Sequence, residues 1–150
     1  MKIEKIFVDA DSCAKGAKSI ILKSAQRKKL KVIYVANKNI PFEFKSELFE
    51  MKICPETEGA ADDYIVENAS ENTLVITRDI PLAERLVTKK IKVMNDRGKE
   101  FTEKNIAECM AQRNLSLQMR QLGISTGGKW NSYCEKDVKT FADSFERLTD

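Results

Sequence analysis

The segment "TLVITRDIPLAERLVTKKIKVMN", residues 73–95, contains a strand, a helix and a second strand in direct succession. Its first five residues form an almost continuous apolar run, which is typical of a strand buried on both faces of a parallel sheet. Pro81 stands in the first turn of the helix predicted over 80–90, where its missing N–H costs nothing. "IKVMN", residues 91–95, predicts the next strand. This unit indicates an α/β protein with a parallel sheet.

The same alternation extends along the chain on both sides of this unit. It predicts further strands over 3–8, 31–37 and 49–54, and helices over 13–28, 58–70, 102–122 and 135–148. A short helix is also predicted over "FEFKSELF", residues 42–49, and a turn around Gly98. The spacing predicts one domain over residues 1–150 with three layers, in which helices flank both faces of a mostly parallel sheet.

Composition limits the class of protein and the chemistry. The chain has 150 residues, of which 42% are hydrophobic and 33% charged, as in a soluble globular domain. No apolar run is long enough to span a membrane, and "MKIEKIF" lacks the apolar region of a signal peptide, so we expect a cytoplasmic protein. The net charge of +3 does not by itself predict nucleic-acid binding. Because the chain contains no histidine, Ser-His-Asp and Cys-His catalysis are excluded.

Carboxylates follow the most apolar predicted strands. Asp9 and Asp11 come at the end of the first strand, in "IFVDADSC", and Asp79 follows "TLVIT". Asp62 and Asp63 stand near the start of a predicted helix. In open α/β sheets, ligands bind at the carboxyl ends of the strands. We therefore expect four or five carboxylates to converge at this edge.

Such a cluster predicts a site for a hard divalent cation. Carboxylates that lie close together repel and raise one another's pKa unless a cation neutralises them. Mg²⁺ and Mn²⁺ prefer oxygen ligands. Two such ions can activate water and stabilise the leaving oxygen in phosphodiester cleavage, and this chemistry needs no histidine.

Each acid except Asp9 also has a purely structural explanation. Asp11 could cap the first helix, and Asp79 could cap the helix that contains Pro81. Asp62 and Asp63 could be first-turn acids favoured by the helix dipole. Asp9 ends a buried run before the helix begins, so it is the strongest candidate for a ligand.

Other side chains could contribute to the same edge. Asn37 and Arg97 follow predicted strands and could contact a substrate phosphate, or could simply be turn residues. "STGG", residues 125–128, could form an anion-binding nest of backbone N–H groups that includes Thr126 and Gly127, or a plain turn. Cys13 could be a nucleophile at a helix N-terminus, but we favour a buried packing role.

Six motifs occur in an order that resembles the bacterial YaiI/YqxD family: "VDADSC", "VAN" at 35–37, "AADDYIV", "LVITRDIPLAE", "NDRGKEFTEKNI" and "STGG". The resemblance covers about residues 3–148. It departs at Ala14 and Lys15, where members usually have proline and valine. The family's fold is grouped with the PIN-like domains, which are metal-dependent nucleases with acids at the carboxyl edge of a parallel sheet.

Carried over residue by residue, this resemblance implies that Asp9, Asp62 and Asp79 are catalytic acids that hold Mg²⁺ or Mn²⁺. Asp11 would be a further metal ligand or a supporting neighbour. The favoured hypothesis is therefore a metal-dependent hydrolase of RNA or DNA, with Arg97 or nearby lysines on the substrate phosphate.

Two other functions compete with this hypothesis. "FVDADSC" also resembles the strand-end DxD of haloacid-dehalogenase-type phosphatases, in which Asp9 would be the nucleophile and Asp11 the acid/base. Against that reading, "AADDY" does not follow an apolar strand. The third hypothesis is a non-catalytic module on the same scaffold that binds nucleic acid or protein.

Overall fold

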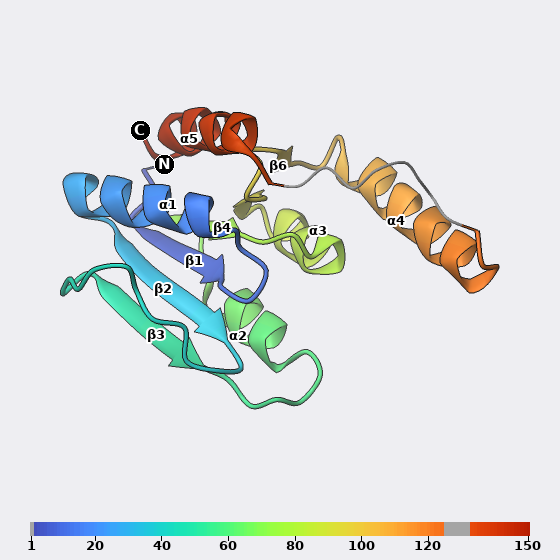
Figure 1. The fold of residues 1–150 in the computed structure, drawn as a ribbon, viewed down its shortest axis with the longest axis horizontal. Coiled ribbons are helices and arrows are strands. Elements are labelled where there is room, and N and C mark those ends of the chain that lie inside the picture. The colour runs from blue at the N-terminus through green and yellow to red at the C-terminus, as the bar shows by residue number, and fades with distance from the viewer. Residues whose placement is uncertain (1, 125–132) are drawn as a thin grey trace.

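The computed structural model describes residues 2–124 and 133–150, and within them one sheet has the strand order β3-β2-β1-β4-β5-β6 (Figure 1). The strands are β1 (Lys5–Asp9), β2 (Lys31–Ala36), β3 (Phe49–Ile53), β4 (Thr73–Ile76), β5 (Lys92–Met94) and β6 (Glu100–Phe101). β1 to β5 run parallel, and β6 pairs antiparallel with β5. The helices are α1 (Lys15–Lys28), α2 (Ala60–Asn68), α3 (Ile80–Thr88), α4 (Ile106–Gln121) and α5 (Glu135–Thr149).

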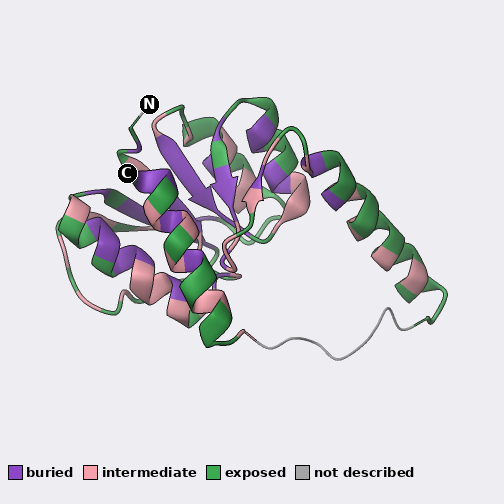
Figure 2. Ribbon diagram, turned by 90° about the horizontal axis from the view of Figure 1, so that it is seen from above, coloured by how far each residue is buried: buried purple, intermediate pink, exposed green. Residues whose placement is uncertain are grey.

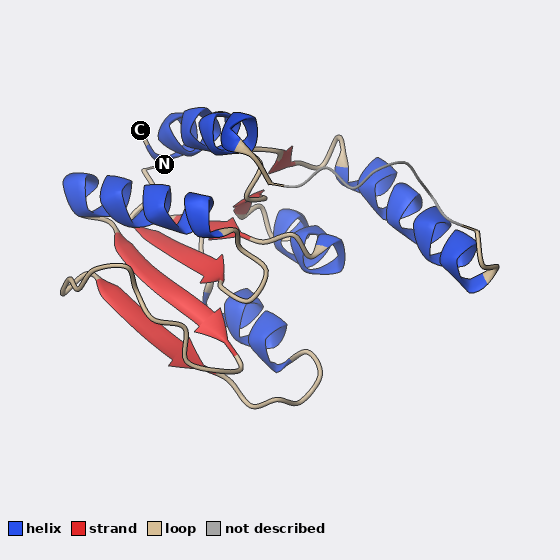
Figure 3. Cartoon of the chain, in the orientation of Figure 1, coloured by secondary structure: helices blue, strands red, loops and turns tan. Residues whose placement is uncertain are grey.

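Helices cover both faces of the sheet (Figure 3). Consecutive residues of a strand point to opposite faces, so Ile6 and Val8 pack with α1 and α5 while Phe7 packs with α2, α3 and the first turns of α4. Each face therefore has its own apolar cluster. This arrangement confirms the predicted α/β fold, with a mostly parallel sheet between two helical layers.

The connections place a topological switch point between β1 and β4. From β1 the chain passes through α1 to β2 and on to β3, and it then returns through α2 to β4 on the other side of β1. Val8 lies beside Ile76 in the register, so Asp9 and Thr77 leave the sheet side by side. A crevice at such a point is the usual ligand site of an open α/β sheet.

The first helix begins later than predicted, at Lys15 rather than residue 13. Asp11 does not cap it, which corrects one of the two expectations for this residue. The N-cap position is occupied by Ala14, whose side chain cannot accept a hydrogen bond. Instead, the Ala14 N–H donates to the Asp96 carboxylate at 2.7 Å. Asp96, which is distant in sequence, thus supplies the hydrogen-bond acceptor that a local N-cap side chain would otherwise provide.

The helix predicted over residues 42–49 is wrong, because this segment forms no helix before β3 begins. Its aromatic side chains pack against β2 and β3, on the face of the sheet that α1 covers. Phe42 lies 4.3 Å from Tyr34, centroid to centroid, and Phe44 lies 5.3 Å from Phe49. Two aromatic residues spaced two apart point to the same side of an extended chain, and their burial outweighs the weak helical pattern.

The turn predicted around Gly98 is present, but it also brings a sixth strand that the sequence analysis missed. Gly98 has φ +93°, and a Cβ there would lie 2.6 Å from the carbonyl oxygen of Thr140. Asn95 Oδ1 accepts hydrogen bonds at 3.0 Å from the N–H groups of Arg97 and Lys99, which holds the turn. Asn95 is therefore a turn residue.

Helix α4 extends away from the rest of the molecule (Figure 2). Ile106 and Cys109 in its first turns are buried, whereas Leu115 and the following Leu122 are exposed. α4 thus contributes to the core only through its beginning. None of the helices in the described part of the chain has the length and hydropathy of a membrane span.

Candidate active site

Asp9 ends β1 and is held by a buried threonine, Thr77, that directly follows the neighbouring strand β4. Thr77 Oγ1 donates a hydrogen bond to Asp9 Oδ2 at 2.9 Å and accepts one from the Asp79 N–H at 3.0 Å. Burial raises the pKa of Asp9, and the nearby carboxylates of Asp79 and Asp11 raise it further. The hydrogen bond from Thr77 offsets this only in part. The Asp9 side chain is thus fixed in place, but its surroundings disfavour its ionised form.

Asp79 has two roles in this structure. It is the N-cap of α3, and its Oδ1 accepts a hydrogen bond from the Leu82 N–H at 3.0 Å, which confirms its capping role. Its charge also raises the pKa values of Asp9 and Asp62. Within the described residues, no donor reaches its second oxygen, Oδ2. Capping therefore leaves one oxygen of Asp79 available at the site.

Asp62 comes to the site from the first turn of α2. Burial, followed by the charges of Asp79 and Asp9, raises its pKa to about 6, and Arg85 counteracts this only in part. The adjacent Asp63 is 60% exposed at its side chain and makes a surface ion pair with Arg85 at 3.0 Å. The two neighbouring acids of α2 therefore differ in role, and only Asp62 couples strongly to the strand-end carboxylates.

The remaining predicted site residues lie at the margin of this cluster or outside the described residues. Asp11 is exposed in the turn after β1, close enough to raise the pKa of Asp9. Asn37 is exposed just beyond the end of β2. Thr126 and Gly127 lie outside the residues that the structure describes.

The donor chemistry of Asp9, Asp62 and Asp79 fits a hard cation, because all three offer carboxylate oxygens that repel one another. Their spacing is looser than that of a formed metal centre. Over residues 2–124 and 133–150, no three His, Cys, Asp or Glu side chains are grouped closely enough to hold an ion. Binding would therefore require these side chains to move closer together.

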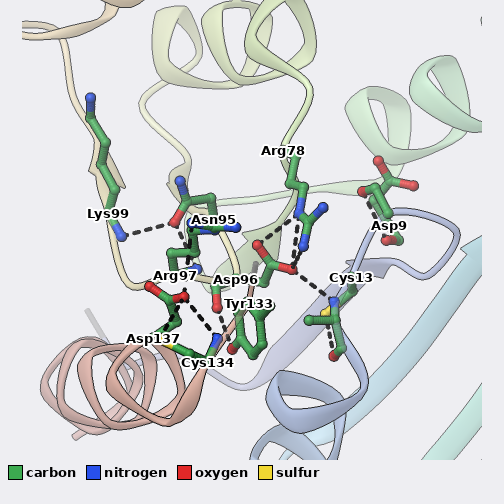
Figure 4. A network of polar contacts seen from close by, with 12 residues as sticks. Asp9, Cys13, Arg78, Asn95, Asp96, Arg97, Lys99, Tyr133, Cys134 and Asp137 are labelled. Carbon is green, nitrogen blue, oxygen red and sulfur yellow. Dashed lines mark hydrogen bonds and ion pairs between the residues drawn. The ribbon is translucent and has the colours of Figure 1, made fainter. Parts of the chain in front are cut away.

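A second polar cluster beside the carboxylates was missed by the sequence analysis (Figure 4). Asp96 follows β5 and is 1% exposed. Arg78, which follows β4, donates from Nε to Asp96 Oδ1 at 2.9 Å and from Nη2 to Oδ2 at 2.6 Å. The hydroxyl of Tyr133 donates to the Asp96 backbone carbonyl at 2.6 Å. Only the positions of Arg78 and Asp96 in the sequence could have indicated this pair, because both residues follow strands that are neighbours in a parallel sheet.

Arg97 lies on the other side of this cluster. Its guanidinium is 3.8 Å from the Asp137 carboxylate and stacks over the Tyr133 ring at 5.9 Å. Figure 4 shows it beside the start of α5, with Asp96 and Arg78 between it and Asp9. Its contact with a substrate phosphate stays a prediction.

Cys13 is buried beside Asp96. Burial first, and then the Asp96 charge, raise the pKa of its thiol to about 12, so the nucleophilic thiolate is disfavoured at neutral pH. This favours the packing role for Cys13 over catalysis.

Replacing Asp62 with asparagine is expected to stabilise the protein by about 1–2 kcal/mol at pH 7.5, after allowance for solvent screening of a partly exposed group. Its pKa rises from 3.8 to about 6 in the folded state, so ionisation opposes folding. The wild type should therefore lose stability as the pH rises from about 4 through 6. The difference in free energy of unfolding between Asp62→Asn and the wild type should vanish below about pH 4.

Urea unfolding at pH 7.5 and pH 3.5 measures this difference. Asp63→Asn is the matched control, because it removes the same charge from the next residue of α2. It should not stabilise, since it loses the ion pair with Arg85. Equal gains in both variants would contradict the placement of Asp62.

Comparison with known proteins finds relatives that align with nearly the whole chain. Residues 7–150 match the profile described as "Uncharacterized BCR, YaiI/YqxD family". A UPF0178 protein of Pseudomonas putida (strain W619) is 38% identical over 96% of this chain and 95% of its own length. A UPF0178 protein of Treponema denticola is 42% identical over 96% of this chain and 90% of its own length. No solved structure matches significantly. The chain therefore belongs to the YaiI/YqxD family.

Proposed function

We propose that this protein is a Mg²⁺- or Mn²⁺-dependent hydrolase of phosphodiester bonds in RNA or DNA, of the PIN-like type, acting in the cytoplasm. One observation carries the proposal. At the switch point of the sheet, the Asp79 carboxylate at the start of α3 raises the pKa values of Asp9 on β1 and Asp62 on α2, and Asp9 also raises that of Asp62. Perturbed pKa values cluster at functional sites, and a cation bound between these carboxylates would relieve their repulsion.

Each acid has a distinct part in the proposed site. Asp9 is oriented by Thr77, Asp79 is fixed by its cap on α3, and Asp62 approaches from α2. These three would hold the cation, with Asp11 as a further ligand or supporting neighbour. When bound, the ion would supply an activated water and charge for the leaving oxygen. Asn37, Arg97, Thr126 and Gly127 are proposed substrate contacts around this centre.

The phosphatase reading gains no support from the fold. Its second acidic pair should follow an apolar strand, whereas Asp62 and Asp63 lie in the first turn of α2. The non-catalytic module remains as an outcome of the experiment below.

Calorimetric titration with Mn²⁺, joined to cleavage assays on labelled single-stranded RNA and DNA, tests the proposal. We expect Mn²⁺ to bind and cleavage to stop when EDTA is added. Asp62→Asn should weaken Mn²⁺ binding by about 10-fold or more. Asp143→Asn removes an exposed carboxylate from α5 and should change nothing. A wild-type protein that does not bind Mn²⁺, or that cuts neither polymer, refutes the hydrolase and leaves the binding module.

A further inference from the structure

We propose that Arg78 binds the phosphate group of the nucleic-acid backbone at this site. The inference rests on the proposed function, because it names the residue that positions the substrate beside the carboxylates. It replaces Arg97 as the main phosphate contact.

The Arg78 guanidinium is held rigidly but is still open to solvent. Its Nε and Nη2 atoms are committed to the buried Asp96 carboxylate, at distances of 2.6 to 3.0 Å. No described residue accepts a hydrogen bond from Nη1, and 46% of the side chain is exposed. An arginine fixed along one edge loses little conformational entropy when its other edge binds an anion.

The backbone places this guanidinium next to the carboxylate cluster. Arg78 stands between Thr77, which donates to Asp9, and Asp79, which caps α3. Figure 4 shows its side chain between Asp96 and Asp9. A phosphate that contacts Nη1 would therefore lie at the same sheet edge as the three acids.

The pairing with Asp96 does not remove the attraction for an anion. Asp96 also accepts a hydrogen bond from the Ala14 N–H at the start of α1, so its charge is shared with the positive end of that helix. A helix N-terminus carries roughly half a positive charge, and Arg78 adds a full one. These two positive charges together exceed the single negative charge of Asp96, before the nearby carboxylates of Asp9, Asp62 and Asp79 are counted. Arg97, by contrast, is paired with Asp137 on α5.

Binding of a fluorescein-labelled ten-nucleotide RNA, measured by anisotropy in EDTA, tests this role without requiring metal or catalysis. Arg78→Gln should weaken binding by about 10-fold. It should also reduce the slope of log affinity against log salt by about 0.7, as expected for one lost phosphate contact on a single strand. Arg78→Lys should fall between, because an ammonium cannot both keep the paired bonds to Asp96 and reach the phosphate.

Arg27→Gln is the matched control. Arg27 is also an exposed, ion-paired arginine, but it lies twelve residues after Lys15 on α1, or about 18 Å along the helix. Its loss should change affinity by less than about twofold.

The outcomes separate this inference from the proposed function. If Arg78→Gln lowers stability but leaves RNA affinity and salt slope unchanged, Arg78 is only a brace between β4, β5 and α1, and the inference is overturned. A wild-type protein that does not bind the RNA overturns it as well. If the RNA binds through Arg78 but is never cut, the inference stands and the hydrolase fails. If cleavage occurs with the same KM in Arg78→Gln, only the inference fails.

Discussion

The Asp9→Asn variant is expected to cleave single-stranded RNA or DNA at least about 100-fold more slowly than the wild type in the presence of Mn²⁺. The change keeps the size of the side chain and an oxygen that can accept the hydrogen bond from Thr77. It removes the charge that the proposed cation would meet. Single-turnover cleavage with saturating enzyme measures the effect on the chemical step.

The same variant should become more stable at pH 7.5, and this separates a functional carboxylate from a structural one. Burial and the neighbouring acids raise the pKa of Asp9 in the folded state, so ionisation opposes folding above the unfolded-state pKa. The melting temperature in EDTA should therefore rise at pH 7.5 and change little at pH 3. A slower enzyme with a lower melting temperature at pH 7.5 would instead assign Asp9 a structural role.

Asp11→Asn distinguishes the two catalytic hypotheses. Asp11 is exposed in the turn after β1. In a metal-dependent nuclease whose main ligands are Asp9, Asp62 and Asp79, the Asp11→Asn change should lower the rate of cleavage by less than about 10-fold. For a dehalogenase-type phosphatase it would be the acid/base, and its loss should be as severe as that of Asp9.

The sequence predicts the fold well where the signal is local and repeated. The apolar runs before Asp9 and Arg78 mark β1 and β4, and the alternation with helices gives the parallel sheet between two helical layers. The same reasoning brings Asp9, Asp62 and Asp79 to one edge, where their charges do interact. These features depend on periodicity and on the direction of the strands.

The features that sequence reasoning missed depend on contacts between distant segments. By local rules Asp11 could have capped α1, but Asp96, 82 positions after Ala14, supplies the acceptor. The two acids of α2 are adjacent in sequence, and only the packed position of the helix separates Asp62 from the exposed Asp63. Arg78 reads as an ordinary turn residue until its carboxylate partner is known.

Asp96→Ala is expected to lower the free energy of unfolding by about 2–3 kcal/mol. The carboxylate is 1% exposed and accepts hydrogen bonds from Arg78 and from the Ala14 N–H. Its removal leaves the start of α1 without an acceptor and releases the arginine. The cost stays below that of a fully buried pair because the half-exposed Arg78 side chain can be solvated.

Urea denaturation with Asp63→Ala as control tests this expectation. Asp63 also pairs with an arginine, but at the surface, so its loss should cost less than about 0.5 kcal/mol. The double variant Asp96→Ala/Arg78→Ala divides the energy between the two contacts of Asp96. Once Asp96 is gone, removing Arg78 should cost almost nothing, although Arg78→Ala alone should cost about 1 kcal/mol. If the two single losses simply add, the ion pair contributes no stability, and Asp96 acts through the N-terminus of α1 alone.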